Sequence, residues 1–288
     1  MKGIYEIKRE FQQQLNEFAE MLENYISDAN NQWVIKGFID IFQNIYPISA
    51  DTKILSKVLE IQLFPKFLEF AKQNDYEIVL TEHQNWYPDI SFISKSDAKI
   101  KFAVDLKTTY SSEKSPEFCN GFTLGSHGTY FIDRKSSKNI QFPYSEYVGH
   151  YCLGIIYSRA ELNKLQETET YELKELSKIP SVIRNFIFFA CEKWTIASDK
   201  SGSGNTANIG SIKRISDILA GNGAFKNLGE EWFDDYWINY GKISIKNDAG
   251  IIRKITTLSE FLKYRGKDKS LYYQPTGRKN KNRKHGKN

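Results

Sequence analysis

The sequence from residue 87 to residue 107, YPDISFISKSDAKIKFAVDLK, constrains the fold most strongly, because it places charged side chains inside two strand-like apolar runs. Residues 90–94 and 100–106 are rich in β-branched and aromatic residues, and a short polar segment joins them. This pattern predicts two neighbouring strands connected as a hairpin. A chain of this kind needs a β-sheet at its centre and partners for the charges that fall inside its buried strands.

Asp89, Asp105 and Lys107 are the charged residues that this hairpin would bring together. Side chains at positions i and i+2 of a strand point to the same face, so Asp105 and Lys107 stand side by side, and the hairpin turns Asp89 towards them. Two carboxylates held close together repel each other, and a divalent cation with a preference for oxygen, such as Mg²⁺, relieves the repulsion. A lysine beside them can stabilise developing negative charge or orient a water. Taken singly, each residue is more commonly a solvated surface charge.

The rest of the chain predicts helices on both sides of a run of strands. Helical spacing of apolar residues is found at 8–26, at 53–73 with an interruption at Pro65, and at 232–240. Strand-like runs are found at 32–48, 76–80, 129–133, 182–191 and 193–197, whereas 145–157 is compatible with a helix or a strand and 201–211 is predicted to be a loop. The predicted fold class is α/β with α+β character: a mixed central β-sheet flanked by helices in a single domain, residues 1–265.

The net charge of +5 is concentrated at the C-terminus. The last eleven residues carry six positive charges and no acid, which leaves the rest of the chain at about −1. The cations are Arg278, Lys279, Lys281, Arg283, Lys284 and Lys287. Residues 266–288 are therefore predicted to form a basic, flexible tail, which either adds non-specific affinity for phosphates or is simply a solvated segment.

Composition excludes several other classes of protein. The three cysteines lie far apart, which argues against a disulfide framework and against a zinc site. No apolar run approaches the roughly 18–20 residues of a membrane span, and the N-terminus has no secretion signal. We therefore expect a cytoplasmic protein that does not associate with membranes.

Pro88-Asp89 together with Asp105-Leu106-Lys107 resembles the PD-(D/E)XK signature of DNA-cleaving enzymes. Further segments resemble the EcoRV type of type II restriction endonucleases and occur in the same order: DTKILSKVLE, QNWYPD, VDLKTTY, FTLG, SKNI and GSGNTANIGSI. The resemblance extends from about residue 30 to residue 240, and the GSGNTANIGSI segment is far more specific than the short catalytic signature.

This resemblance implies roles for individual residues. Asp89 and Asp105 would be metal ligands, Lys107 would be the catalytic lysine, and Glu60 would be a further helix carboxylate at the metal site. The loop at 202–211 would read the major groove, because glycines let the backbone approach base edges and asparagine pairs well with adenine. The residues implied in DNA binding are Gly202, Ser203, Gly204, Asn205, Thr206 and Asn208 in this loop, Gln84 and Asn85 towards the minor groove, and Thr108, Thr109, Lys53 and Lys138 near phosphates. Without the resemblance, Glu60 could be an exposed helix position, and the Gly-Ser loop could be a flexible surface loop.

The resemblance also implies an activity: Mg²⁺-dependent hydrolysis of double-stranded DNA at a palindrome, GATATC, cut at its centre to leave blunt ends with 5′ phosphates and 3′ hydroxyls. Cutting both strands of a palindrome calls for a homodimer. Residues 30–50, with Trp33, Phe38, Phe42 and Tyr46, are the predicted dimer segment, unless they are ordinary core. A cognate DNA methyltransferase would protect the host.

Three alternatives stay open. They are a structure-specific or repair nuclease of the same fold, a DNA-binding protein without catalytic activity, and a metal-binding or protein-interaction module without a DNA role. The sequence also departs from the family pattern at three places. Residues 125–130, GSHGTY, are one residue longer, which brings in His127 without an evident role. Ala207 stands where a threonine is expected, and the basic tail is additional.

Overall fold

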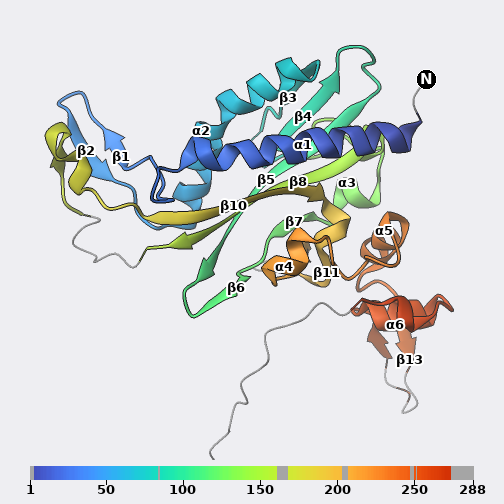
Figure 1. Cartoon of the computed structure of the whole chain (residues 1–288). Coiled ribbons are helices and arrows are strands. Elements are labelled where there is room, and N and C mark those ends of the chain that lie inside the picture. Colours follow the sequence, from blue (N-terminus) through green and yellow to red (C-terminus); the bar gives the residue numbers. More distant parts are fainter. Residues whose placement is uncertain are drawn as a thin grey trace, which may run out of the picture.

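The computed structural model describes residues 3–83, 85–160, 168–202, 207–246, 250 and 252–273. Its centre is a six-stranded sheet in the order β10-β8-β5-β4-β3, with β6 paired to β5 (Figure 1). These strands are β3 (Tyr76–Leu80), β4 (Ile90–Ser94), β5 (Lys101–Ser112), β6 (Ser115–Cys119), β8 (Gly149–Arg159) and β10 (Ile183–Glu192). β5 and β8 pair in parallel, while the other described pairs in this sheet are antiparallel. The predicted mixed central sheet is confirmed.

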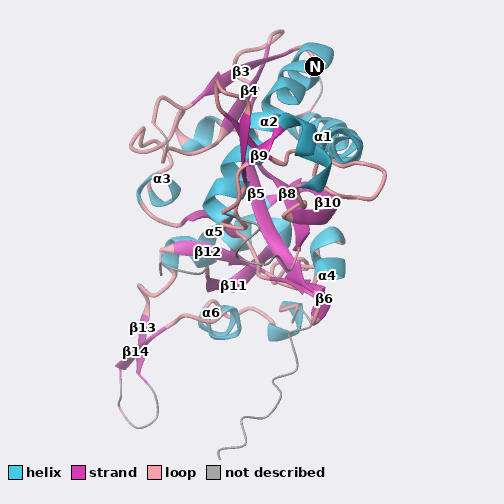
Figure 2. Cartoon of the chain, turned by 90° about the vertical axis from the view of Figure 1, so that its left-hand side faces the viewer, coloured by secondary structure: helices cyan, strands magenta, loops and turns pink. Residues whose placement is uncertain are grey.

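Helices cover the sheet on both faces (Figures 1 and 2). They are α1 (Ile4–Ile26), α2 (Thr52–Gln73), α3 (Thr129–Ile132), α4 (Ile215–Leu219), α5 (Glu230–Asn239) and α6 (Leu258–Tyr264). Alternation along β5 assigns its side chains to the two faces: Phe102 and Val104 pack in a core with α1 and α2, whereas Ala103 belongs to the core that contains α5 and α6. Asp105 and Lys107 lie two and four residues after Ala103, so they are on the same face of β5 as Ala103 and point away from α1 and α2.

Three smaller sheets complete the fold. They consist of β1 (Gly37–Ile39), β2 (Asn44–Pro47) and β9 (Tyr171–Glu172); of β7 (Thr123–Ser126), β11 (Ala197–Ser201) and β12 (Asn208–Ser211); and of β13 (Ser244–Lys246) and β14 (Ile252–Lys254). The first sheet forms a lobe that projects from one end of the molecule (Figure 1). Short 3₁₀ helices are η1 (Tyr144–Glu146), η3 (Leu173–Lys178), η4 (Lys193–Ile196) and η5 (Lys269–Leu271). No described helix is long and apolar enough to cross a membrane.

The predicted helix at 53–73 is not interrupted at Pro65, because α2 runs through it. A proline inside a helix leaves the carbonyl four residues earlier, here that of Ile61, without its usual donor. Ile61 and Pro65 both lie on the exposed side of α2, where water can satisfy that carbonyl. The apolar side of the helix, which includes Leu59 and Leu63, stays packed in the core.

Three predictions of local structure were wrong. Residues 129–133 form the short helix α3 instead of a strand, and the segment at 193–197 begins as the 3₁₀ helix η4 before β11 starts. The predicted loop at 201–211 includes the strand β12 at its end. The ambiguous segment at 145–157 is mostly the strand β8, which lies between β5 and β10 and is buried over nearly its whole length.

Candidate active site

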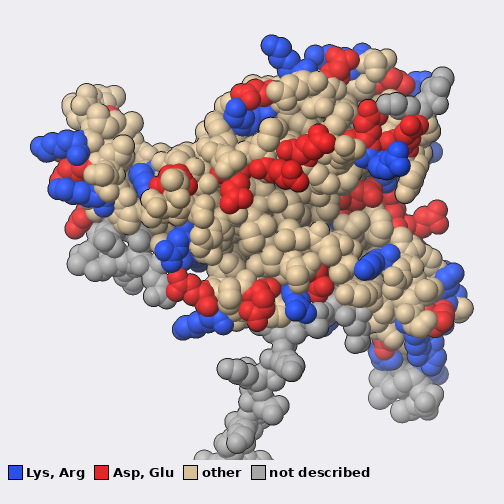
Figure 3. Space-filling view, viewed as in Figure 1, with Lys and Arg blue, Asp and Glu red and all other residues tan. Residues whose placement is uncertain are grey.

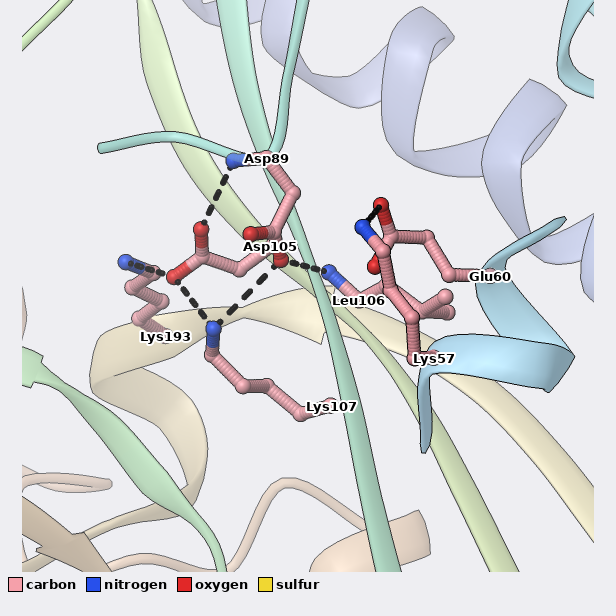
Figure 4. Close-up of polar contacts among 7 residues, drawn as sticks. All are labelled: Lys57, Glu60, Asp89, Asp105, Leu106, Lys107 and Lys193. Atoms are coloured by element: carbon pink, nitrogen blue, oxygen red, sulfur yellow. Dashed lines mark hydrogen bonds and ion pairs between the residues drawn. The ribbon is translucent and has the colours of Figure 1, made fainter. Parts of the chain in front are cut away.

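The β4–β5 hairpin brings the two aspartates together as the sequence predicted. Ile90 of β4 lies opposite Val104 of β5, so Asp89, one residue before β4, reaches Asp105, one residue after Val104. The backbone amide of Asp89 donates to Oδ1 of Asp105 at 3.2 Å, and the backbone amide of Leu106 donates to Oδ2 of Asp89 at 2.8 Å (Figure 4). Each carboxylate is thus held by the backbone of the other strand.

Two lysines neutralise these carboxylates. The ammonium of Lys107 lies 3.2 Å from Oδ2 of Asp105 and 3.5 Å from Oδ2 of Asp89, as predicted for a lysine on the same face of β5. The ammonium of Lys193, the first residue of η4, lies 2.8 Å from Oδ2 of Asp105. The sequence analysis did not identify Lys193, which comes from a distant part of the chain.

These contacts determine the charge states of the site. Burial alone would raise the pKa of Asp105, but Lys107 and Lys193 outweigh it and lower this pKa to about 2. Burial lowers the pKa of Lys107, but Asp105 and Asp89 reverse the effect and raise it above the usual value. Burial raises the pKa of Asp89, and the charge of Asp105 adds to the rise. At neutral pH Asp105 is therefore ionised and Lys107 is protonated.

A magnesium ion fits the donor set of this site. Asp89 and Asp105 offer carboxylate oxygens, which Mg²⁺ prefers, and the side chain of Asp89 is 38% exposed, so ions can reach it. Within the described residues no group of three or more His, Cys, Asp or Glu side chains gathers as a metal site. An ion bound by these two aspartates would complete its coordination with waters and phosphate oxygens, as Mg²⁺ does in many phosphate-processing sites.

Glu60 is not joined to the two aspartates. Its carboxylate accepts from the ammonium of Lys57 at 2.8 Å on the exposed surface of α2. Figure 4 shows this pair to one side of the cluster formed by Asp89, Asp105 and Lys107. The charge of Glu60 contributes to the raised pKa of Asp89, but no direct contact links the two residues. Its role as a metal ligand stays a prediction.

The cluster opens into a cleft that also contains residues predicted to bind DNA. The cleft measures about 370 Å³ and contains Asp89, Asp105 and Lys107 together with Asn85 and Asn208. A second cleft of about 390 Å³ adjoins it and contains Thr108 and Thr109. Its wall shares Lys107 and Gly125 with the first cleft. The structure thus places four of the predicted DNA-binding residues around the cluster.

The predicted recognition loop is fastened at its base to the wall of the cleft. The amide of Gly202 donates to the carbonyl of Asn208 at 2.8 Å, which closes the β11–β12 hairpin, and Asn208 pairs with Ser126 of β7. The amide of His127 donates to the carbonyl of Ala207 at 2.9 Å. Ser203, Gly204, Asn205 and Thr206 of the loop, and Gln84, lie outside the described residues. The ring of His127 packs near Trp237 and Tyr240.

The remaining predicted phosphate contacts lie nearby without lining either cleft. Lys53 is exposed in the first turn of α2, directly after Thr52, which does line the second cleft. Lys138 is exposed directly before Asn139, which lines the first cleft and which sequence reasoning did not single out. Asn139 lies in the SKNI segment, so the resemblance was the only signal that pointed to it.

Acidic side chains gather on the face of the molecule that α1 covers. A row of acidic side chains crosses this face (Figure 3), and the exposed acidic residues of α1 include Glu10, Glu17 and Glu20. Such a row repels phosphates, so an anionic ligand would approach the other face of the sheet, towards which Asp105 and Lys107 point.

Two comparisons relate this chain to known proteins. Residues 29–266 match the family model described as restriction endonuclease EcoRV. The chain is 36% identical over 250 residues to a protein from Escherichia coli named type II restriction enzyme EcoRV, and the match covers 85% of this chain and 97% of that protein.

Proposed function

Because the chain belongs to the EcoRV family of type II restriction endonucleases, we propose that it cleaves double-stranded DNA at one palindromic sequence with the help of Mg²⁺. The observation that carries this proposal is the shared cleft, in which Asp89, Asp105 and Lys107 lie beside Asn85 and Asn208. Groups that suit phosphoryl chemistry and groups that can contact bases thus face the same space. We further propose that the cleaved sequence is GATATC and that the ends are blunt; residues 202–211, GSGNTANIGS, support this.

The proposed reaction is attack of a water on phosphorus in line with the departing 3′ oxygen, which gives a 5′ phosphate and a 3′ hydroxyl. Asp89 and Asp105 would hold the magnesium ion, which would supply positive charge at the phosphate and lower the pKa of a water. Lys107, kept protonated by Asp105, donates hydrogen bonds that orient the water or stabilise charge on the phosphate. Asp105 is ionised before the metal and DNA bind, because Lys107 and Lys193 lower its pKa to about 2.

A plasmid with a single GATATC site tests this activity. With Mg²⁺ we expect conversion to a linear product with blunt ends, and with EDTA we expect no cutting. A matched plasmid with a scrambled site serves as the control. The plasmid is prepared without methylation, since we also propose that a cognate methyltransferase protects the host. Cutting of both plasmids alike, or of branched DNA only, would instead favour a repair nuclease of the same fold.

The lobe that contains β1 and β2 is proposed to form a homodimer with a second copy of the chain. Its exposed apolar residues include Phe38, Ile39, Ile41, Phe42 and Tyr46, with Ile41 at 90% exposure. In Figure 3 the top of this lobe is largely free of charged side chains, and the charged side chains of the lobe lie below it. An apolar patch of this kind marks an interaction surface. Trp33, which the sequence also assigned to this segment, is fully buried core.

Replacing both Ile41 and Phe42 by lysine is expected to dissociate the dimer. Burying an isoleucine or phenylalanine side chain is worth about 1.5–3 kcal/mol, and a two-fold interface counts each loss twice, so Kd should rise at least about a thousandfold. Light scattering on the full chain measures the effect, and Met21→Lys, at an exposed apolar position on α1, is the control. A wild-type chain that stays monomeric on cognate DNA would disprove the dimer.

We also propose that the basic C-terminal tail contacts DNA phosphates. The last described residues lie beside β11, which leads into the proposed recognition loop: the hydroxyl of Tyr272 lies 3.4 Å from Oδ2 of Asp199 in β11, and Tyr272 lines a cleft of about 800 Å³ with Lys200 and Gly202. Removing residues 277–288 should lower the slope of log Kd against the logarithm of the salt concentration by up to about five, since each phosphate contact contributes about 0.9 to this slope. Filter binding across a salt series measures the slope, and an unchanged slope would leave the tail a solvated segment.

A further inference from the structure

Lys193 is a buried cation at the centre of the active site. Its side chain is 7% exposed, and its ammonium lies 2.8 Å from Oδ2 of Asp105, whose side chain is 3% exposed. Lysine is almost never fully buried unless it is paired. Lys193 begins η4, directly after the sheet strand β10 and shortly before β11, which leads into the loop at 202–211.

The surroundings of Lys193 leave its ammonium little freedom. The ammonium lies 3.8 Å from the centre of the Tyr87 ring, a favourable cation–π arrangement. A Cβ atom on Gly125 would lie 3.5 Å from the same nitrogen, so β7 passes close to the ammonium at this glycine. Tyr87 is in turn fixed by a 2.8 Å hydrogen bond between its hydroxyl and Nδ1 of His150. Lys193 therefore touches both Asp105 and the aromatic residue that precedes Pro88-Asp89.

The side chain of Lys107 has more freedom to move than that of Lys193. Its side chain is 23% exposed, it lines both clefts, and its ammonium lies within 3.5 Å of both aspartates. A divalent ion bound by the two aspartates would compete with Lys107 for the same oxygens. Lys107 has open space into which it can move, whereas Lys193 is enclosed by Asp105, Tyr87 and Gly125.

We propose that Lys193 is a positioning residue that holds Asp105 in place as a fixed counter-charge, while Lys107 is the cation that gives way when a metal ion binds. This inference rests on the proposed metal-dependent function. In the metal-free protein the carboxylate of Asp105 is paired with both lysines, and Lys193 keeps it paired when Lys107 moves away. The same fixed charge repels a divalent cation and moderates its affinity.

The substitution Lys193→Met tests this role, because methionine fills a similar volume without the charge. We expect the affinity for Mn²⁺ to rise on the order of tenfold or more, since repulsion from a nearby buried cation is lost. We expect Mn²⁺ to raise the Tm of K193M more than that of the wild type. At saturating Mn²⁺, kcat for DNA cleavage should fall, because Asp105 loses the contact that orients it. Tighter metal binding with slower turnover is a combination that a purely structural lysine would not produce.

Electron paramagnetic resonance of Mn²⁺ and thermal melts of the full chain provide the first two readouts. Lys193→Arg keeps the charge and should leave Mn²⁺ affinity near the wild-type value, and Lys178→Met, which removes an exposed ion pair with Glu175, should change nothing. If K193M does not fold alone, the double variant D105N/K193M, which removes both charges, should fold. Failure of the double variant would contradict a role that acts through Asp105.

Two negative results can be told apart. If the wild type neither binds Mn²⁺ nor cuts DNA, the proposed function itself fails. If the wild type cuts DNA and K193M shows the same Mn²⁺ affinity and the same Mn²⁺-induced change in Tm, only the role of Lys193 is overturned.

Discussion

Replacing Asp105 by asparagine should lower the rate of DNA cleavage by at least about a thousandfold, because a metal ion contributes several kcal/mol to such a reaction and each 1.36 kcal/mol is a factor of ten. Asparagine keeps the shape of the side chain but removes the charge that binds a cation. It also takes the ion-pair partner from Lys107 and Lys193. Single-turnover cleavage of a duplex with one cognate site, at saturating Mg²⁺, measures the rate.

Stability must be checked for this variant, since Asp105→Asn leaves the buried Lys193 without its counter-charge. Asp89→Asn provides a second test with less risk to folding, because the side chain of Asp89 is 38% exposed. Asp97→Asn, an exposed position in the turn of the same hairpin, is the matched control and should cut like the wild type. If D89N and D105N are folded and cut at the wild-type rate, the assignment of the two aspartates is wrong.

Replacing Asn208 by alanine should remove much of the discrimination between the cognate palindrome and other sequences. Asn208 lines the cleft with Asp89 and lies at the base of the predicted recognition loop. A good bidentate contact between asparagine and adenine is worth about 1–3 kcal/mol. A homodimer makes the contact twice, so we expect kcat/KM on the cognate site to fall about thirtyfold or more.

The comparison that makes this test specific is a set of duplexes that each differ from the cognate site at one base pair. Asn208→Ala should cut these duplexes about as well as the wild type does, and its DNA binding should keep the same salt dependence, because no phosphate contact is removed. Asn24→Ala, on the exposed surface of α1, is the control. An equal loss on every duplex would mean that Asn208 supports the fold of β12 and does not read a base.

Local sequence was sufficient to predict the carboxylate cluster. Asp105 and Lys107 are two residues apart on one strand, and a short turn returns the chain to Asp89, so strand geometry alone brings the three together. Lys193 could not be found in this way. It reaches Asp105 through the pairing of β10 with β8 and of β8 with β5, which are contacts between distant parts of the chain. The only local signal was a lysine at the end of an apolar run.

Short apolar segments were the least predictable part of the fold. Residues 129–133 satisfy a strand pattern, yet the chain forms α3, whose Tyr130 and Phe131 pack into the core with the aromatic ring of Tyr87. Four residues are too few to show a period, so tertiary packing decides. The helix at α2 was predicted from its apolar periodicity, and its continuation through Pro65 depends on the exposure of that side of the helix to water.

Digestion of unmethylated phage DNA with Mg²⁺, followed by sequencing of the fragment ends, tests the central claim most directly, because it presupposes no recognition site. We predict discrete fragments whose ends are blunt and all lie at the centre of one palindrome, GATATC, with no cutting in EDTA. Discrete fragments at another palindrome would retain the restriction activity and correct the sequence that the loop reads. A continuous smear, or DNA that stays intact with Mg²⁺ present, would contradict the claim that this chain is a sequence-specific endonuclease.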